Sequence, residues 1–304
     1  MGDVLIKVAA FVSIIVAGYV SGRSGWLGKG TGSTISKIVF NLTLPCAVIN
    51  AFGQVDFTRD LLWLILVGVA FTVGAYFVMF AVTVRCPRQD RIFYLCNISG
   101  YNIGCFALPF VQAFFPPAQV VAICLFDSGN AFMMSGGIYA LTSVLTCEER
   151  PAHPVRLVIR RLLSSVTIDA YAVLIALALA GIRIPDFVVQ FTAPMAGANA
   201  FLALFMLGLM TSLEITREKV GKLLGLVSAR LAFNVAFTLV ALFVLPFSPA
   251  VRVVLCMGVW APQGAMGPVF TMWCKGDHGL AGFANAISMA VSIVAMTVIV
   301  LNAG

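Results

Sequence analysis

Long apolar stretches separated by short polar segments run through the whole chain. A helix needs about 20 mostly apolar residues to cross the hydrocarbon core of a bilayer, and the stretches have this length. The charges, prolines and glycines at their ends predict ten membrane-spanning helices. In chain order, these spans 1 to 10 are expected at 4–21, 33–52, 61–84, 92–115, 119–145, 162–182, 187–213, 223–245, 251–273 and 280–301. The pattern therefore predicts an all-α membrane protein.

The composition agrees with this prediction and excludes a soluble domain. Of the 304 residues, 61% are hydrophobic and 10% are charged, and the mean hydropathy is +1.03. A soluble domain carries roughly 25% charged residues. The net charge of +7 is therefore interpreted as basic cytoplasmic loops, not as a nucleic-acid-binding surface.

The distribution of the basic residues orients the spans. Fourteen of the nineteen Lys and Arg residues follow odd-numbered spans, and three follow even-numbered spans. Because cytoplasmic loops carry the excess of positive charge, the loops after odd-numbered spans are expected in the cytoplasm and both termini outside. The chain starts with Asp3 and Lys7 and not with a basic cluster, so span 1 is expected to be retained in the plasma (inner) membrane and not cleaved as a signal peptide.

The sequence offers no signature of a metal site, a cofactor or an enzyme. None of the eight cysteines belongs to a C-x-x-C pair, and His153 and His278 lie apart in polar connectors. A G-x-S-x-G motif with a membrane histidine, an H-E-x-x-H motif and a Walker A motif are all absent. We therefore expect neither catalysis nor direct use of ATP.

The spans divide into two halves of five. The first half covers residues 1–145, a polar cytoplasmic linker covers 146–161, and the second half covers 162–304. Because five is odd, the second half starts from the opposite side of the membrane, so related halves would form an inverted repeat.

Proline falls inside the second and the fourth span of each half at similar spacing. The residues expected to interrupt helices are Pro45, Gly104, Pro109, Pro194, Pro262 and Pro268. Broken backbone cannot face lipid, so it is buried in protein or lines a cavity. Interrupted spans at matching positions of two halves indicate a transporter site, where the amino-terminal ends of half-helices favour an anion. The alternative is a pair of kinked packing helices.

Several short motifs occur in a fixed order along nearly the whole chain. They are Gly18-Tyr19, Asn41-Leu42-Thr43-Leu44-Pro45, Asn102-x-Gly104 followed by Pro109, Ala261-Pro262-Gln263, and a last span with Ala286, Ser288 and Ser292. Together they resemble the auxin efflux carrier family, whose bacterial members include malonate-type organic-acid carriers. The resemblance implies two inverted five-helix repeats, crossing broken helices in spans 4 and 9, a scaffold half and a moving transport half. This architecture is similar to that of bile-acid symporters and sodium/proton antiporters.

Two departures from the family's pattern prevent the substrate from being carried over. The stretch before Pro109 reads Cys105-Phe106-Ala107-Leu108, where a glycine is expected beside the proline, and the bulky Trp260 stands just before Pro262. The long central hydrophilic loop of plant auxin carriers is absent.

Polar side chains in the spans are the candidate ligands. Asn102 leads, because its amide both donates and accepts hydrogen bonds, and capping of a broken helix is its alternative role. The full set of candidate substrate-binding residues is Asn102, Gln263, Asn97, Tyr101, Asn41 and Asn199. Asp127 and Asn130 in span 5 are candidates for a coupling ion, because an intramembrane carboxylate is often functional; a neutral structural Asp127 is the alternative. We expect the Arg230 side chain in span 8 to extend to the membrane surface.

These observations predict a secondary transporter of a small organic anion, a carboxylate or an auxin-like acid, that works by alternating access. Its partners would be that anion, a proton or sodium ion, and membrane lipid, and a homodimer is compatible with the resemblance. A sodium-coupled bile-acid-type symporter and a cation/proton antiporter are alternatives within transport. A ligand-sensing membrane protein without transport is the alternative of a different class.

Overall fold

The computed structural model describes residues 1–28, 30–55, 59–146, 154–211 and 219–303. Within these ranges the chain is helical apart from turns, short connections and one isolated two-residue bridge. The elements are α1 (Gly2–Arg23), α2 (Thr31–Ile38), η1 (Val39–Thr43), α3 (Leu44–Gly53), η2 (Arg59–Leu62), α4 (Trp63–Val82), α5 (Arg88–Ile98), η3 (Ile103–Ala107), α6 (Leu108–Phe114), α7 (Pro117–Phe132), η4 (Met133–Gly137), α8 (Ile138–Thr146), α9 (Pro154–Leu162), α10 (Val166–Leu179), α11 (Asp186–Met210), α12 (Val220–Phe243), α13 (Pro249–Val259), α14 (Gly267–Trp273) and α15 (His278–Ala303). The elements named η are single turns of tighter or wider helix.

Among the described residues, seven helices are long and apolar enough to cross a membrane. They are Gly2–Arg23, Thr31–Gly53, Arg59–Val82, Pro117–Thr146, Asp186–Met210, Val220–Phe243 and His278–Ala303. Spans 4, 6 and 9 correspond to shorter helices, namely α5 with α6, α10, and α13 with α14. The prediction of an all-α membrane protein is thus confirmed, and the count of ten crossings stays a prediction.

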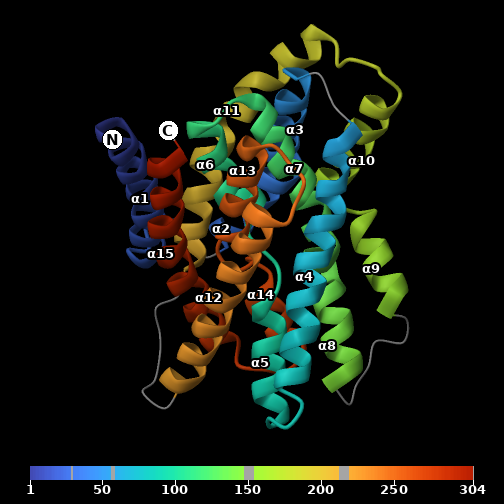
Figure 1. Ribbon diagram of the computed structural model, residues 1–304. Helices are drawn as coiled ribbons and strands as arrows, with labels where there is room; N and C mark the ends of the chain where they lie inside the picture. Colours follow the sequence, from blue (N-terminus) through green and yellow to red (C-terminus); the bar gives the residue numbers. More distant parts are fainter. Residues whose placement is uncertain (29, 56–58, 147–153, 212–218, 304) are drawn as a thin grey trace.

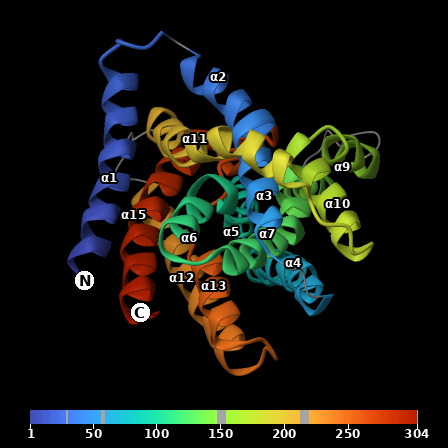
Figure 2. The same ribbon diagram turned by 90° about the horizontal axis from the view of Figure 1, so that it is seen from above.

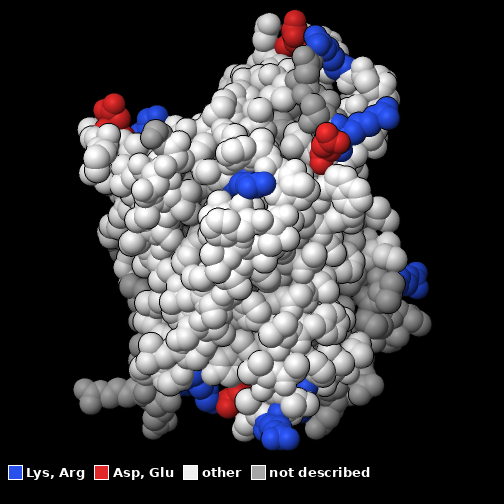
Figure 3. Space-filling view, viewed as in Figure 1, with Lys and Arg blue, Asp and Glu red and all other residues white. Residues whose placement is uncertain are grey.

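The charged residues on the molecular surface fit a protein embedded in a bilayer. Figure 3 shows Lys, Arg, Asp and Glu side chains mainly near the two ends of the molecule, with a broad uncharged surface between them. At one end, the Lys219 ammonium forms an ion pair with the Asp277 carboxylate at 2.6 Å. Both termini lie at the other end (Figure 1). Because a lipid-facing surface must be free of charge, this distribution supports an integral membrane protein.

Two features of the helices differ from what the apolar pattern suggests. Residues 154–161 of the expected linker form, together with Leu162, the helix α9, in which Val158 is buried and Arg156 and Arg160 are exposed. Charged residues on one face of an amphipathic helix lower its average hydropathy, so a search for apolar stretches misses it. The breaks expected at Pro194 and Pro45 are absent: α11 continues past Pro194, and the helical segment Thr31–Gly53 continues past Pro45. A proline removes one helical hydrogen bond, and neighbouring helices in a membrane protein tolerate that loss.

Close helix pairs build the framework around the site. The helix α11 packs along α1 and α3, and Figure 2 shows it crossing above the centre of the bundle. The helix α4 packs along α7. Glycines allow these approaches: a Cβ atom on Gly208 would lie 2.0 Å from the Ile15 carbonyl oxygen, and one on Gly129 would lie 2.1 Å from the Ile65 carbonyl oxygen. Small residues at such crossings are typical of helix packing in membranes.

Alanine substitutions at two glycines of α11 should separate the effect of helix packing on stability from the effect of helix propensity. Gly208→Ala forces α1 and α11 apart and should lower the free energy of unfolding by about 1–3 kcal/mol. Gly197 has open space around it, so Gly197→Ala should be neutral or should stabilise the protein by up to about 1 kcal/mol. The midpoints of thermal unfolding of both variants in detergent would measure the difference. Equal midpoints would contradict the close approach at Gly208.

Candidate functional site

Two helices stop inside the bundle, and the chain segments that follow them pair with each other. The helix α5 ends at Ile98 and α13 ends at Val259. We call residues 99–102 the first break and residues 260–266 the second break. Tyr101 and Gln263 form an antiparallel bridge, in which the Asn102 N–H donates to the Pro262 carbonyl at 2.9 Å. The interruptions expected in spans 4 and 9 therefore meet in space.

The local sequence explains why the helices stop here. Gly100 has a φ of +83°, a left-handed conformation that glycine adopts readily. A Cβ atom there would also lie 2.3 Å from the Met134 sulfur. Pro268 lies in the first turn of α14, where a missing N–H costs no helical hydrogen bond. Gly104 and Pro109 were expected to interrupt span 4, but both lie inside the continuous helical segment Ile103–Phe114 that follows the first break. Glycine thus permits the first break, and proline marks the start of α14 after the second break.

Side chains from neighbouring helices satisfy the backbone of both breaks. The Asn130 side chain on α7 accepts from the Tyr101 N–H and donates to the Tyr101 carbonyl, both at 2.9 Å. The Ser288 hydroxyl oxygen on α15 accepts from the Gln263 N–H at 3.0 Å. Buried backbone groups need such partners away from water. Both atoms of the Asn130 amide are therefore engaged in holding the first break.

Arg230 on α12 also contacts the first break, which the sequence did not predict. Its Nη1 donates to the carbonyls of Ile98 at 2.8 Å and Asn97 at 3.2 Å, and its guanidinium lies 5.6 Å from the centre of the Tyr101 ring. The residue is 6% exposed, so the expected extension to the membrane surface was wrong. The last carbonyls of a helix lack helical partners and carry partial negative charge, and this attracts the guanidinium.

A cavity of about 290 Å³ lies beside the first break, between α7, α10 and the η1–α3 segment. Its polar lining consists of Tyr101, Asn102, Asp127, Asn130, Ser135, Ser165, Thr167 and Tyr171, and its apolar lining includes Phe40, Leu44, Ile103 and Met266. Within the described part of the chain, the Asn102 Nδ2 atom has no hydrogen-bond partner although it is buried. An unpaired buried donor in the wall of a cavity is the arrangement expected of a ligand-binding group.

Asp127 lies in the same cavity and is already bonded to protein. Its carboxylate oxygens accept from the Asn130 amide at 2.9 Å and from the Tyr171 hydroxyl at 3.0 Å. A Cβ atom built on Gly104 would lie 3.6 Å from one of these oxygens, so the carboxylate is close to the start of the helical segment Ile103–Phe114. The hydrogen bond from Tyr171 joins α7 to α10 across the cavity.

Gln263 and Asn97, predicted as substrate ligands, lie outside this cavity. The Gln263 amide donates to Asn97 Oδ1, and the Asn97 amide donates to the Thr271 hydroxyl at 2.9 Å. Gln263 borders a separate cavity of about 20 Å³ together with Arg230 and Asn234. These contacts link the two breaks to α14.

The other two predicted ligands are also outside the cavity. Asn199 on α11 accepts from the Thr43 hydroxyl at 3.0 Å. Asn41 in η1 is exposed and does not line the cavity, although its neighbour Phe40 does. Of the six candidates, the structure therefore brings only Asn102 and Tyr101 to the cavity wall.

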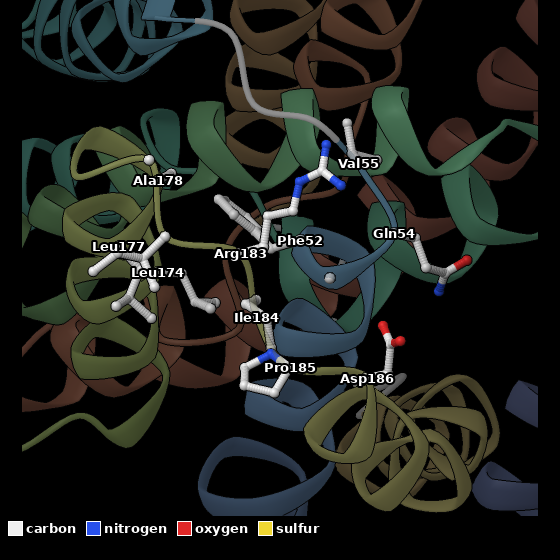
Figure 4. A pocket seen from close by; sticks show the side chains of 13 residues that line it. Phe52, Gln54, Val55, Leu174, Leu177, Ala178, Arg183, Ile184, Pro185 and Asp186 are labelled. Atoms are coloured by element: carbon white, nitrogen blue, oxygen red, sulfur yellow. The ribbon is translucent and has the colours of Figure 1, made fainter.

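A larger cavity of about 650 Å³ lies at the end of α3, against the connection between α10 and α11. Figure 4 shows Arg183 and Asp186 at its edge, with Phe52, Leu174 and Ile184 forming its apolar wall. None of the residues of the two breaks lines it. The larger cavity therefore lacks the interrupted backbone and the unpaired Asn102 donor that line the smaller cavity.

Two helices that stop inside the bundle, α5 and α13, thus lead into segments that meet beside a cavity. A family model described as "membrane transport protein" matches residues 3–300. The chain belongs to this family. It is the auxin efflux carrier family, so the resemblance found in the motifs is confirmed. A search of curated proteins found no match.

Membership of the family establishes the class of the protein. It is an integral membrane transporter, and its family is one of transporters and not of enzymes. A transported small molecule follows from the class.

Proposed function

We propose that this chain carries a small organic anion across the membrane by alternating access and binds it in the cavity beside the first break. The observation that carries the proposal is the unpaired, buried Asn102 amide in the cavity wall. An N–H donor of this kind matches a carboxylate oxygen, which only accepts hydrogen bonds. Asn102 directly precedes the helical segment Ile103–Phe114, whose first N–H groups and dipole favour a negative charge.

The size of the cavity favours a small acid. Its volume of about 290 Å³ is at the lower end of the roughly 300–1,000 Å³ range of ligand pockets. A bulky steroid acid would not fit without rearrangement. The same volume and the mostly apolar wall suit a short mono- or dicarboxylate or an aromatic acetic acid.

Alternating access requires two groups of helices that move relative to each other. We infer that α1–α3, α10 and α11 form the scaffold and that α4–α8 and α12–α15 form the transport group, as two inverted repeats imply. The cavity then lies between the groups, because α7 and the first break face η1, α3 and α10. The lining residues Ser135 and Ser165 lie toward the predicted cytoplasmic end, so the described conformation would be open to the cytoplasm.

Charge movement in proteoliposomes tests the function. Purified protein would be challenged with mono- and dicarboxylates and with indole-3-acetate, at two pH values, with and without sodium. We expect a saturable current for a subset of small acids. Neither current nor stabilisation against thermal unfolding by any acid would overturn the proposal; binding without transport would instead indicate a sensor. A strict requirement for sodium would favour the bile-acid-type symporter.

The hydrogen bond between Tyr171 and Asp127 should stabilise the described conformation, because it crosses between the two groups. Tyr171→Phe removes a bond worth about 0.5–1.5 kcal/mol and should shift the population away from this conformation. With a Ser135→Cys label in the cavity, we expect alkylation to slow about three- to tenfold. Tyr76→Phe is the matched control, because its hydroxyl bonds Thr142 at 3.0 Å within the transport group. If Tyr171→Phe and Tyr76→Phe were alkylated at equal rates, the hydrogen bond between Tyr171 and Asp127 would not stabilise the described conformation.

A further inference from the structure

The end of α5 is built to hold a cation. Three backbone carbonyls, those of Asn97, Ile98 and Gly100, lie 3.2, 2.8 and 3.5 Å from a single nitrogen, Arg230 Nη1. Two of them belong to the last turn of α5, where the helix dipole adds negative potential. The Tyr101 ring supplies an additional cation–π contact. A ring of carbonyl oxygens inside a membrane protein is also the environment that binds small monovalent ions.

The guanidinium of Arg230 occupies this place as a charge that is not neutralised by an acid. Among the described residues, no carboxylate forms an ion pair with Arg230. The guanidinium is buried and its Nη2 atom has no partner within the described chain. A buried charge is costly unless it is compensated, and here the compensation comes from carbonyl dipoles. One of these carbonyls, that of Gly100, belongs to the first break, and the other two end α5 directly before it.

We propose that Arg230 is a tethered cation that takes the place of a coupling metal ion at the first break, so that transport of the anion needs no sodium. The inference rests on the proposed function and names its coupling. The permanent positive charge keeps α5 and the first break in the conformation that presents Asn102 to the cavity. Because the guanidinium is part of the chain, it is not released on either side of the membrane. Each turnover therefore moves only the charge of the substrate and of any proton.

The small cavity beside Arg230 gives this assignment a further consequence. It measures about 20 Å³ and is lined by Arg230, Asn234, Gln263 and Ser288. Arg230 Nη2 is a donor and Gln263 Oε1 an acceptor, and both lack partners among the described residues. A cavity of this size holds one water molecule. Removing the guanidinium would enlarge it into a space bordered by carbonyl oxygens, where a sodium ion could bind.

Sodium dependence of Arg230 variants tests the inference. In the wild-type chain, exchanging sodium for choline at constant ionic strength should change the transport rate by less than twofold. It should leave the midpoint of thermal unfolding unchanged. Arg230→Ala should lose at least 20-fold in transport rate. Sodium or guanidinium at tens of millimolar should restore part of the rate and raise the unfolding midpoint of this variant.

Two further variants control for fold and for charge. Arg230→Met fills the space without a charge, so its transport should be lost and should not respond to either ion. Arg252→Ala should stay insensitive to sodium, because Arg252 donates to the Leu242 carbonyl at 2.7 Å, away from the breaks.

The outcomes separate the inference from the proposed function. Wild-type transport that requires sodium, or Arg230→Met transport at the wild-type rate, would overturn the inference and leave the anion carrier intact. Absence of any anion transport or binding in the wild type would overturn the proposed function. The cation site would then still be tested by unfolding midpoints: no stabilisation of Arg230→Ala by sodium or guanidinium over choline overturns it.

Discussion

Replacing Asn102 with aspartate should weaken anion binding at least 100-fold. The two side chains have nearly the same shape, so the cavity keeps its volume. The substitution removes the unpaired Nδ2 donor and places a carboxylate where the substrate carboxylate is expected. A hydrogen bond to a charged group contributes about 1.5–3 kcal/mol, and repulsion between like charges adds to the loss. Tenfold in affinity corresponds to about 1.4 kcal/mol, so a 100-fold effect is within this range.

Isothermal titration of the purified variants with the best substrate measures this effect. Asn102→Ala should lose less than Asn102→Asp, because it removes the donor without adding a charge. Asn302→Asp is a suitable control, since Asn302 is exposed at the end of α15. If Asn102→Asp bound the anion as tightly as the wild type, Asn102 would not be a ligand.

The second large effect is expected when Asn130 is replaced, because its amide holds the first break in place and its loss should lower the stability of the site. Asn130→Ala leaves the Tyr101 N–H and carbonyl without their partner and removes one donor to Asp127. Each buried polar group left unpaired costs about 1–3 kcal/mol, so the free energy of unfolding should fall by about 2–5 kcal/mol. Transport should be lost at the same time, because the first break loses its support.

A comparison with Asn285 isolates this role. Asn285 on α15 is half-buried, and its Oδ1 atom has no partner among the described residues. Asn285→Ala should therefore change the unfolding midpoint and the transport rate little. A folded Asn130→Ala protein with normal transport would show that the first break does not depend on the Asn130 amide.

The apolar pattern predicts the long helices well because each is a single uninterrupted stretch. Spans 1, 3, 8 and 10 correspond closely to α1, α4, α12 and α15. The fourth and ninth spans are interrupted near the predicted glycines and prolines, since these residues change the local backbone whatever surrounds them. The effect of Pro194 depends instead on how neighbouring helices support α11, and that information is not local in the sequence.

Only part of the candidate site could be predicted, because here too only the local features are visible in the sequence. Asn102 and Tyr101 were found because they belong to the break itself, and they line the cavity. The register between the two breaks decides that Gln263 contacts Asn97 and not the cavity, and one sequence contains no direct signal for it. Arg230 carried a signal, a basic residue inside an apolar span, but the direction of a long side chain depends on what its helix packs against.

Binding of the anion in the 290 Å³ cavity can be measured through the protection of a cysteine label by substrate. Ser135→Cys would be placed in the 290 Å³ cavity and Gln54→Cys in the 650 Å³ cavity, in a chain lacking Cys86, Cys105 and Cys147. Alkylation of each would be followed with and without the acid that gives the largest current. We expect the acid to slow alkylation of Ser135→Cys at least tenfold at saturation and to leave the alkylation rate of Gln54→Cys unchanged. Protection of Gln54→Cys alone would show that the substrate binds in the larger cavity and not beside Asn102.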